Sequence, residues 1–441
     1  MIYIENLIIG AGISGLTTAF FLKRNNKQFL ILDSQPKAGG KIKGQYIDGY
    51  RIEYGPNTVL FNNDPFKDIV KHLQLEKDLI YSNPQVKNRF ILKKNIIYKI
   101  PTNISSFLSS KLLSFKGKIS IFKDLFSKRD IDDLPVENFI KLRFGSQIHD
   151  NLIEPFLTGV YASDTSKLSA KYSLKKLWQF QKESRSIILG LLKNSKIQKS
   201  SIVYFSRGFD YFIDKLVNFV KDNLLFSCKA LSIERKNDFL IVNTECGKQI
   251  KCKKLFISTE STQISKMIFD VSLKEVLQKI KYNSIDVVHL GFEKKKTKFN
   301  FNGFGLLTRK KDKHNFLGVL YNSQIFSNVC FEKNELITVL VGGQNNPRIV
   351  KENPDEVLKI IKNDMKNLFK ISSFNFEKHF RWREAIPIYS INHDLVNKEI
   401  QKFHVNNPNI FINSNFIDGV SVSDCILKSF DSVMKSLITA K

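Results

Sequence analysis

The chain has few cysteines and no ordinary membrane segment. Its cysteines lie far apart in the sequence, at Cys228, Cys246, Cys252, Cys330 and Cys425. Because no two form a C-x-x-C pair, the spacing predicts neither a dithiol redox site nor a zinc site, and the pattern indicates a reducing compartment. One apolar run, residues 7–22, approaches the ~18 residues that a membrane-spanning helix needs, but three glycines interrupt it. We therefore expect no signal segment, no membrane-spanning helix and a cytoplasmic protein.

Acidic residues are also scarce relative to basic ones. The chain has 42 Asp and Glu against 69 Lys and Arg, which gives a net charge of +27. The lysines are spread along the whole sequence, and scattered charge describes a solvated basic surface better than a defined site. We expect no nucleic-acid partner, whereas an anionic substrate or an anionic membrane surface remains compatible. With 441 residues and no internal repeat, the chain can bury a large core in two or three structural units.

A strand, turn, helix and second strand near the N-terminus carry the strongest functional signal. Residues 5–9 and 28–32 predict strands, residues 14–24 predict a helix, and Asp33 follows the second strand. The turn has the G-x-G-x-x-G pattern, in Gly10, Ala11, Gly12, Ile13, Ser14 and Gly15. Its glycines permit a tight turn, close approach to a pyrophosphate and close helix packing, and the helix directs free N–H groups at the phosphates. An acid about 20 residues further on binds a ribose 2′-hydroxyl and repels a 2′-phosphate, so the unit predicts FAD or NAD over NADP.

The next segment favours FAD. It contains a paired glycine followed by a basic residue, and then an E-x-G-P element at residues 53–56. This combination resembles the FAD-binding amine oxidase superfamily, and the chain has a single G-x-G-x-x-G, whereas flavoproteins reduced by NAD(P)H usually carry a second dinucleotide fold. The resemblance implies cofactor contacts at Ser34, Gly39, Gly40, Lys41, Gly55, Pro56, Asn57 and Thr58.

Further sequence blocks along the chain indicate a family more specifically than the N-terminal unit does. They are Glu154-Pro155-Phe156-Leu157-Thr158-Gly159-Val160-Tyr161-Ala162-Ser163-Asp164 with Leu168-Ser169, residues 303–307, residues 317–323, Arg381-Trp382 with residues 385–389 and His393, and residues 418–426. Together these blocks resemble the oxygen-dependent protoporphyrinogen oxidase family over most of the chain. The resemblance adds cofactor contacts at Ala230, Ser258, Trp382, Asn415, Gly419, Val420 and Val422. Two departures from the family pattern weaken the prediction of tight FAD binding: Ser414 stands where the family has glycine, and Ala230 stands where it has valine.

The resemblance implies a mixed α/β and α+β fold with a discontinuous domain plan. A Rossmann-like FAD-binding domain would comprise residues 1–80, 200–265 and 395–441. An antiparallel-sheet substrate domain would comprise 81–100 and 266–394, and a helical membrane-associating subdomain 101–199. Apolar periodicity agrees: it predicts strands at 284–292 and 335–342, and helices at 105–113, 116–126, 136–144 and 174–182.

The first half of the helical block permits two interpretations. Apolar residues alternate with lysines there, in Phe107, Leu108, Lys111, Leu112, Leu113, Phe115, Lys116, Lys118, Ile119, Ile121, Phe122, Lys123, Leu125 and Phe126. A basic amphipathic pattern of this kind lies in membrane interfaces. An ordinary helical subdomain that packs its apolar stripe inward has the same periodicity. Both interpretations stay open, as does peripheral attachment to the cytoplasmic face of a membrane.

The implied reaction is the FAD-dependent, six-electron oxidation of protoporphyrinogen IX to protoporphyrin IX in haem biosynthesis, with molecular oxygen as acceptor. The flavin would carry the chemistry, so no catalytic side chain and no metal is required, and we interpret His289 and His393 as structural. Arg89 aligns with the family's propionate-binding arginine, and Phe304 with an aromatic residue against the macrocycle. The resemblance leaves open contact with ferrochelatase or with a second copy of the chain.

Two other classes of function remain. One is a related flavin enzyme, acting on coproporphyrinogen III or, more distantly, an amine oxidase or carotenoid desaturase. The other is a noncatalytic flavin-binding or membrane-docked protein with the same fold.

Overall fold

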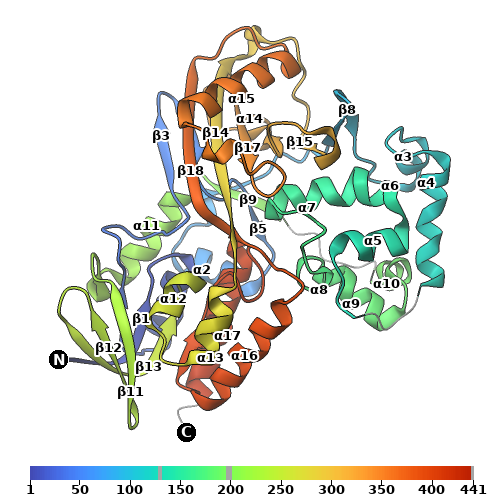
Figure 1. The fold of residues 1–441 in the computed structure, drawn as a ribbon. Coiled ribbons are helices and arrows are strands. Elements are labelled where there is room, and N and C mark those ends of the chain that lie inside the picture. The colour runs from blue at the N-terminus through green and yellow to red at the C-terminus, as the bar shows by residue number, and fades with distance from the viewer. Residues whose placement is uncertain (128–131, 195–200, 439–441) are drawn as a thin grey trace.

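The computed structural model describes residues 1–127, 132–194 and 201–438 (Figure 1). Residues 128–131 and 195–199 of the expected helical subdomain lie outside the described residues, as do residues 200 and 439–441 of the expected FAD-binding domain. Two large sheets and a block of helices make up most of the structure. This mixture confirms the predicted α/β and α+β fold class.

The first sheet has a parallel centre. Its strand order is β10-β2-β1-β13-β12-β11, and β19 pairs with the end of β13. The parallel strands are β10 (Leu224–Leu225), β2 (Phe29–Leu32), β1 (Ile2–Ile9), β13 (Gln249–Ile257) and β19 (Ile410–Ile412). The antiparallel strands at the edge are β12 (Phe239–Thr244) and β11 (Ala230–Lys236). The central strands read as nearly continuous apolar runs because both faces of this part of the sheet are covered.

Successive residues of β1 face two different cores. Ile8 belongs to the core on one face, whereas Leu7 and Ile9 belong to the core on the other, as the alternation of a strand requires. The Ile8 side is covered by α1 (Ile13–Arg24), α2 (Asp64–His72), α11 (Phe209–Val220) and α17 (Val422–Ile438). The opposite side is covered by α12 (Ser261–Met267), α13 (Val271–Gln278) and α16 (His393–Asn406).

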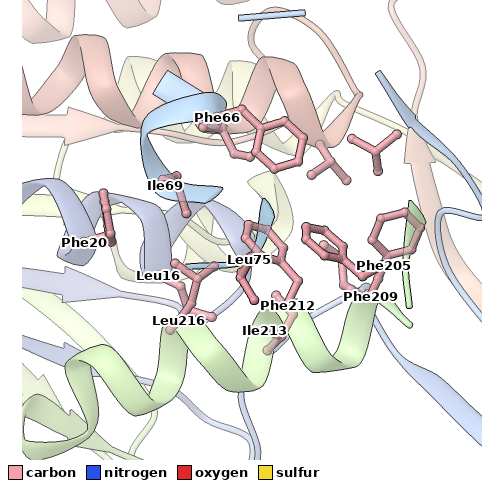
Figure 2. Packing of buried hydrophobic residues seen from close by; sticks show 14 of the residues in the cluster. Leu16, Phe20, Phe66, Ile69, Leu75, Phe205, Phe209, Phe212, Ile213 and Leu216 are labelled. Carbon is pink, nitrogen blue, oxygen red and sulfur yellow. The ribbon is translucent and has the colours of Figure 1, made fainter. Parts of the chain in front are cut away.

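The Ile8 side of the sheet has a core rich in phenylalanine. Figure 2 shows Leu16 and Phe20 of α1 with Phe66 and Ile69 of α2, above Phe212 and further residues of α11. The Phe205 and Phe212 rings stack with centroids 4.8 Å apart. Each fully buried large side chain of this kind stabilises the fold by roughly 1.5–3 kcal/mol. The packing fixes α1, and therefore its N-terminus, against the sheet.

The second sheet lies above the first in Figure 1. Its order is β18-β14-β17-β16-β15-β7-β8. The strands are β18 (Phe376–Pro387), β14 (Tyr282–Glu293), β17 (Asn334–Gly342), β16 (Gly318–Leu320), β15 (Gly305–Thr308), β7 (Arg89–Lys93) and β8 (Ile96–Lys99). The predicted strands at 284–292 and 335–342 correspond to β14 and β17. All pairings are antiparallel except that of β15 with β7, which is parallel. Helix α15 (Pro354–Phe369) packs its apolar stripe on this sheet.

The helical block is at the right of Figure 1. It comprises α3 (Ile104–Ser109), α4 (Phe115–Ile119), η2 (Ser120–Phe126), α5 (Val136–Phe144), α6 (Ser146–Ile148), η3 (His149–Ile153), α7 (Glu154–Tyr161), α8 (Ala170–Ser173), α9 (Lys175–Ser184) and α10 (Ile187–Lys193). The predicted helix at 136–144 is α5, and the one at 174–182 corresponds to α9, which begins one residue later, at Lys175. The predicted helix at 105–113 ends early, at Ser109, because Leu112 and Leu113 turn into the core and the Leu112 carbonyl accepts hydrogen bonds from Lys93 and Asn151.

Two small sheets and several short helices connect these parts. The sheets are β3 (Gly44–Ile47) with β4 (Tyr50–Glu53), and β5 (Val59–Phe61) and β6 (Leu79–Tyr81) on either side of β9 (Ser201–Phe205). The short helices are η1 (Glu76–Asp78), η4 (Lys221–Asn223), η5 (Lys294–Lys296), η6 (Lys310–Asp312), α14 (Asn322–Ile325) and η7 (Ile349–Lys351). Within the described ranges, none of the helices combines the length and apolar character required to cross a membrane.

Candidate functional site

The predicted cofactor residues gather where the parallel strands of the first sheet end. Gly10 follows β1, Asp33 follows β2 and Ser258 follows β13. The segment that leads to Asn415 follows β19, and the segment that leads to Ala230 follows β10. Since these strands are parallel, their carboxyl ends lie at one edge of the sheet, which is where open α/β sheets bind ligands.

The glycine turn has no room for side chains. Gly10 has a φ of +103°, which L residues rarely adopt, and a Cβ at Gly15 would lie 1.7 Å from the Gly10 carbonyl oxygen. Gly12 caps α1 without a side-chain hydrogen bond, and the first turn of α1 contains no acidic residue. The free N–H groups and the positive end of the helix dipole are therefore available to a phosphate.

Asp33 braces this turn. Its Oδ2 accepts a hydrogen bond from the Ala11 amide at 2.6 Å, and its Oδ1 accepts one from the Gln35 amide at 2.7 Å. Burial raises the pKa of Asp33, and the two amides oppose that shift. A carboxylate has about four acceptor positions, so the half-buried Asp33 keeps capacity for a ribose hydroxyl. Ser34 beside it is exposed.

The second glycine pair docks on the first turn. The Gly39 amide donates to the Ala11 carbonyl at 2.9 Å, and Gly39 pairs with Gly12 in a β-bridge. A Cβ built on Gly40 would lie 3.2 Å from the Gly12 Cα. Lys41 follows, and its Nζ lies 3.5 Å from Glu260 Oε1. Burial lowers the pKa of Lys41, and the Glu260 carboxylate acts in the opposite direction.

Residues 55–58 approach the same place. A Cβ at Gly55 would lie 2.0 Å from the Lys41 carbonyl oxygen, so the backbones touch there. Pro56 and Thr58 flank Asn57, whose buried Oδ1 accepts hydrogen bonds from Asn322 at 2.9 Å and Thr338 at 3.3 Å. These contacts give Asn57 a bracing role toward α14 and β17.

Unpartnered polar atoms mark the interior of the site. The hydroxyl oxygens of Ser258 and Thr259 are buried and have no hydrogen-bond partner among the described residues. They follow β13, and the Ser258 carbonyl oxygen would lie 2.7 Å from a Cβ on Gly10. Buried hydroxyls without partners are rare and call for an occupant. A dinucleotide with hydroxyl and phosphate oxygens fits the glycine-lined turns and these two hydroxyls.

The closing segment is held by a residue that the motifs did not predict. The Ser414 hydroxyl donates to the Thr259 carbonyl at 2.6 Å, so the serine that departs from the family's glycine ties this segment to the end of β13. Lys428 Nζ donates to the carbonyls of Ser414 at 3.0 Å and Gly419 at 3.3 Å. The carbonyl of Asn415 accepts a hydrogen bond from Tyr389. Burial lowers the pKa of Lys428. In a chain with so many lysines, nothing in the sequence distinguishes this one.

The remaining closing residues begin α17. Gly419 has a φ of +86°. Val422 is buried in the core on the Ile8 side of the first sheet, and Val420 packs on the core of the helical block. The Ser429 hydroxyl of α17 donates to the Ser14 carbonyl at 2.9 Å, which joins α17 to α1.

The segment before Ala230 and the side chain of Trp382 contact the loops that carry predicted cofactor residues. The Cys228 amide, two residues before Ala230, donates to the Asp33 carbonyl at 2.9 Å. Trp382, on β18, donates from Nε1 to the Tyr54 carbonyl at 2.6 Å. The first contact joins the loop before β11 to Asp33, and the second joins the second sheet to Tyr54, the residue before Gly55.

Arg89 and Phe304 form a separate pair. The Arg89 guanidinium lies over the Phe304 ring, 4.8 Å from its centroid, because β7 and β15 place Arg89 opposite Gly305. Packing lowers the pKa of Arg89, and no acidic side chain among the described residues forms an ion pair with it. Within the described residues, no hydrogen bond joins this pair to the glycine turns.

The two histidines that we interpreted as structural, His289 and His393, are both buried. His289 is fully buried on β14 and its Nδ1 lies 2.9 Å from Thr338 Oγ1; burial lowers its pKa to about 3, which keeps it neutral. His393 packs against the rings of Tyr172 and Tyr389, and its Nε2 lies 3.2 Å from the Ile417 carbonyl.

The amphipathic block faces both ways. Leu112 and Leu113 are buried in the helical core, and Phe107 and Ile121 are partly buried against it. Other apolar side chains on α3, α4 and η2 face solvent, and we call them the apolar cap: Ile104, Leu108, Phe115, Ile119, Phe122 and Phe126. Phe115 is 78% exposed and Phe126 is 82% exposed. The alternating pattern therefore contains two sets of apolar residues: one set packs on the helical core and the other is exposed to solvent.

Comparison with known proteins agrees with this geometry. The model of the flavin containing amine oxidoreductase family matches residues 13–427. The chain belongs to this family. Membership confirms the prediction of a flavin, and the dinucleotide-type turn makes FAD the flavin that fits.

Relatives and a solved structure span nearly the whole chain. The chain is 24% identical to coproporphyrinogen III oxidase of Bacillus subtilis (strain 168), covering 95% of each chain. It is 28% identical to protoporphyrinogen oxidase 2, chloroplastic/mitochondrial, of Arabidopsis thaliana, covering 95% of this chain and 91% of that one. A crystal structure from Exiguobacterium sp. 255-15, provisionally named a protoporphyrinogen oxidase, superposes with a TM-score of 0.85 at 19% identity and covers 99% of both chains.

Proposed function

We propose that the chain is an oxygen-dependent porphyrinogen oxidase that converts protoporphyrinogen IX to protoporphyrin IX. The observation that carries the proposal is that relatives named for porphyrinogen oxidation align over 95% of the chain. Coproporphyrinogen III is the second candidate substrate, because one of those relatives is named for it. Arg89 lies over Phe304 and has no acidic partner within the described residues, which supports an aromatic substrate with carboxylate arms.

The residues of the first sheet would hold the cofactor. We infer that the Gly10–Gly15 turn and the N-terminus of α1 bind the pyrophosphate, and that Asp33 binds the adenosine ribose. Ser258 would donate to the dinucleotide, while the segment around Ala230 lies beside the adenine. Residues 39–41 and 55–58, Trp382, Asn415, Gly419, Val420 and Val422 would surround the remainder. When bound, FAD supplies the hydride acceptor for three two-electron oxidations, and oxygen removes the electrons as hydrogen peroxide.

The second sheet would position the substrate. A propionate needs a partner when it leaves water for an apolar pocket, and the Arg89 guanidinium presents a planar fork that matches a carboxylate. Phe304 would offer its ring to the macrocycle. With no acid–base residue required, the side chains bind, orient and exclude water. In this proposal the segments around the first sheet hold the cofactor, and the second sheet holds the substrate.

The apolar cap supports peripheral attachment to an anionic membrane. Exposed aromatic side chains such as Phe115 and Phe126 lie among Lys111, Lys116 and Lys123, whose side chains are also exposed. A surface of this composition inserts apolar groups between lipids while its lysines contact anionic headgroups. The helices of the cap would lie in the interface rather than cross it.

The test of the proposed function compares the two porphyrinogens. Purified protein is incubated aerobically with protoporphyrinogen IX or coproporphyrinogen III, and porphyrin fluorescence and hydrogen peroxide are followed together. We expect a faster enzyme-dependent rise with protoporphyrinogen IX, and three peroxides per porphyrin, as three two-electron steps require. A faster rise with coproporphyrinogen III would transfer the assignment to the second candidate. Flavin-containing protein with no turnover of either substrate would overturn both.

A further inference from the structure

Two cysteines that are distant in the sequence meet in the structure. Sγ of Cys228 and Sγ of Cys246 lie 2.7 Å apart, although both are free thiols. The spacing of the cysteines indicated no C-x-x-C pair, and this contact joins cysteines that are 18 residues apart: Cys228 precedes β11 and Cys246 lies in the turn after β12. A disulfide bond is about 2.05 Å long, so the two sulfur atoms need to approach by only a small distance.

The register of the sheet explains the contact. Strands β11 and β12 pair Ala230 with Thr244, and the Glu245 amide donates to the Lys229 carbonyl at 2.8 Å. Beyond this pair the two segments leave the sheet, and the side chains of Cys228, in the loop before β11, and Cys246, in the turn after β12, meet.

We propose that Cys228 and Cys246 form a reversible disulfide when hydrogen peroxide oxidises them. Cys246 is exposed and meets the oxidant, whereas Cys228 is buried and acts as the resolving thiol. The pairing with Cys228, and a contact to Thr244 Oγ1 at 3.2 Å, lower the pKa of Cys246. The thiolate is the reactive form of cysteine.

The proposed reaction is balanced. The Cys246 thiolate attacks one peroxide oxygen, the O–O bond breaks, and hydroxide leaves and is protonated to water. Cys246 is then a sulfenic acid. The Cys228 sulfur displaces its oxygen as a second water and forms the S–S bond. The two thiols lose two electrons, and one hydrogen peroxide gains them.

The position of Cys228 gives the disulfide a consequence for the cofactor. The Cys228 amide donates to the Asp33 carbonyl at 2.9 Å, and the Ser227 amide donates to the Gln35 carbonyl at 3.1 Å. A bond from Cys228 to the hairpin at Cys246 would fix this segment against the end of β2. Pre-organised sites lose less freedom when they bind, so we expect the oxidised protein to release FAD roughly threefold more slowly.

Intact-mass measurement tests the proposal on reduced, flavin-loaded protein treated with stoichiometric hydrogen peroxide. We expect a loss of about 2 Da that dithiothreitol reverses, and a proteolytic peptide linking residues 228 and 246. Cys246→Ser should abolish the loss. Cys228→Ser should instead leave a sulfenic acid on Cys246 that dimedone labels. Cys330→Ser is the matched control and should behave like the unaltered chain.

Two results would contradict the proposal. An unchanged mass loss in Cys246→Ser would place the disulfide elsewhere, and an absence of mass loss with dimedone labelling in the unaltered chain would show that Cys228 does not resolve the sulfenic acid. Equal FAD dissociation rates before and after oxidation would overturn the link to the cofactor. Because peroxide is added as a reagent, none of these results depends on the porphyrinogen assignment.

Discussion

The Asp33 carboxylate accepts a hydrogen bond from the Ala11 amide, 2.6 Å away, inside the glycine turn. The acid predicted to bind a ribose therefore also holds the shape of the turn that is predicted to bind phosphate. A single side chain thus connects both halves of the proposed dinucleotide site. Loss of Asp33 should affect the protein with and without FAD.

Asp33→Ala should weaken FAD binding. Hydrogen bonds to a charged group contribute about 1.5–3 kcal/mol, which corresponds to roughly a 10- to 150-fold rise in Kd. The Tm of the FAD-free variant should also fall, because the Ala11 amide loses its acceptor. Flavin fluorescence titration and calorimetry measure the two effects, with the exposed Glu275→Ala as control. A raised Kd with an unchanged FAD-free Tm would limit Asp33 to the ribose.

The local unit around Asp33 was predictable from the sequence because short-range rules determine it. A strand, a turn whose conformation only glycine adopts easily, and an apolar helix follow one another in β1, the Gly10–Gly15 turn and α1. Helix α5 agrees with its predicted range for the same reason: its apolar residues recur at helical spacing between Pro135 and Gly145.

Contacts between distant segments were not predictable in this way. Lys428 donates to the Ser414 carbonyl, and Cys228, in the loop before β11, contacts Cys246, in the turn after β12. Such contacts depend on strand register, on bulges and on how helices cross. Short-range sequence patterns do not specify these features. The amphipathic block shows the same limit: periodicity identified its apolar residues but not which of them would face solvent.

The apolar cap should determine binding to lipid vesicles. Phe115→Asp with Phe126→Asp removes exposed aromatic surface and adds repulsion from anionic lipid, where each nearby charge contributes about 1 kcal/mol. Sedimentation with anionic vesicles should fall at least tenfold in partition coefficient. Leu395→Asp with Val405→Asp, exposed positions on α16, is the matched control. Equal losses in both double variants would indicate nonspecific attraction to the basic surface.

A buried ion pair should stabilise the helical block. Arg143 and Asp124 are fully buried and 2.6 Å apart, and Arg143 also donates to Gln181 on α9. Arg143→Met leaves the Asp124 charge without its partner, which typically costs about 3–5 kcal/mol. Lys67→Ala, which breaks the exposed pair with Asp64, should cost less than about 1 kcal/mol. Denaturant unfolding measures both, and similar small costs would show that Asp124 is held by its other contacts.

Glu53 should make stability fall as the pH rises. Burial raises its pKa from 4.5 to about 8, against the opposing hydrogen bonds from Tyr204 and the Phe209 amide. The folded chain therefore retains a proton that the unfolded chain has released, so unfolding becomes easier between about pH 4.5 and 8. Glu53→Gln keeps an acceptor for both donors and removes the titration. Its Tm should decline less over this range, whereas the exposed Glu76→Gln should not alter the slope; parallel curves for Glu53→Gln and the unaltered chain would contradict the assignment.

Arg89 should determine how tightly a porphyrinogen binds. It lies over Phe304 and, within the described residues, has no acidic partner, so a substrate propionate would supply the missing anion. Hydrogen bonds to a charged group contribute about 1.5–3 kcal/mol, and because Arg89 is exposed, the loss expected for Arg89→Ala is at the lower end of that range. The loss should appear mainly as a raised KM, since the pair acts in both ground and transition states. Arg89→Lys should recover part of it, because an ammonium lacks the planar fork.

Flavin content provides the control within the same variants. Arg89 lies outside the cofactor residues, so the flavin absorbance per protein should stay normal in Arg89→Ala, and the exposed Arg348→Ala should leave both turnover and flavin unchanged. Steady-state kinetics with each porphyrinogen then separates the substrates: a tetracarboxylate that keeps other cationic contacts should lose less than a dicarboxylate that depends on Arg89. Full activity of Arg89→Ala at low substrate would show that a different cation binds the propionate.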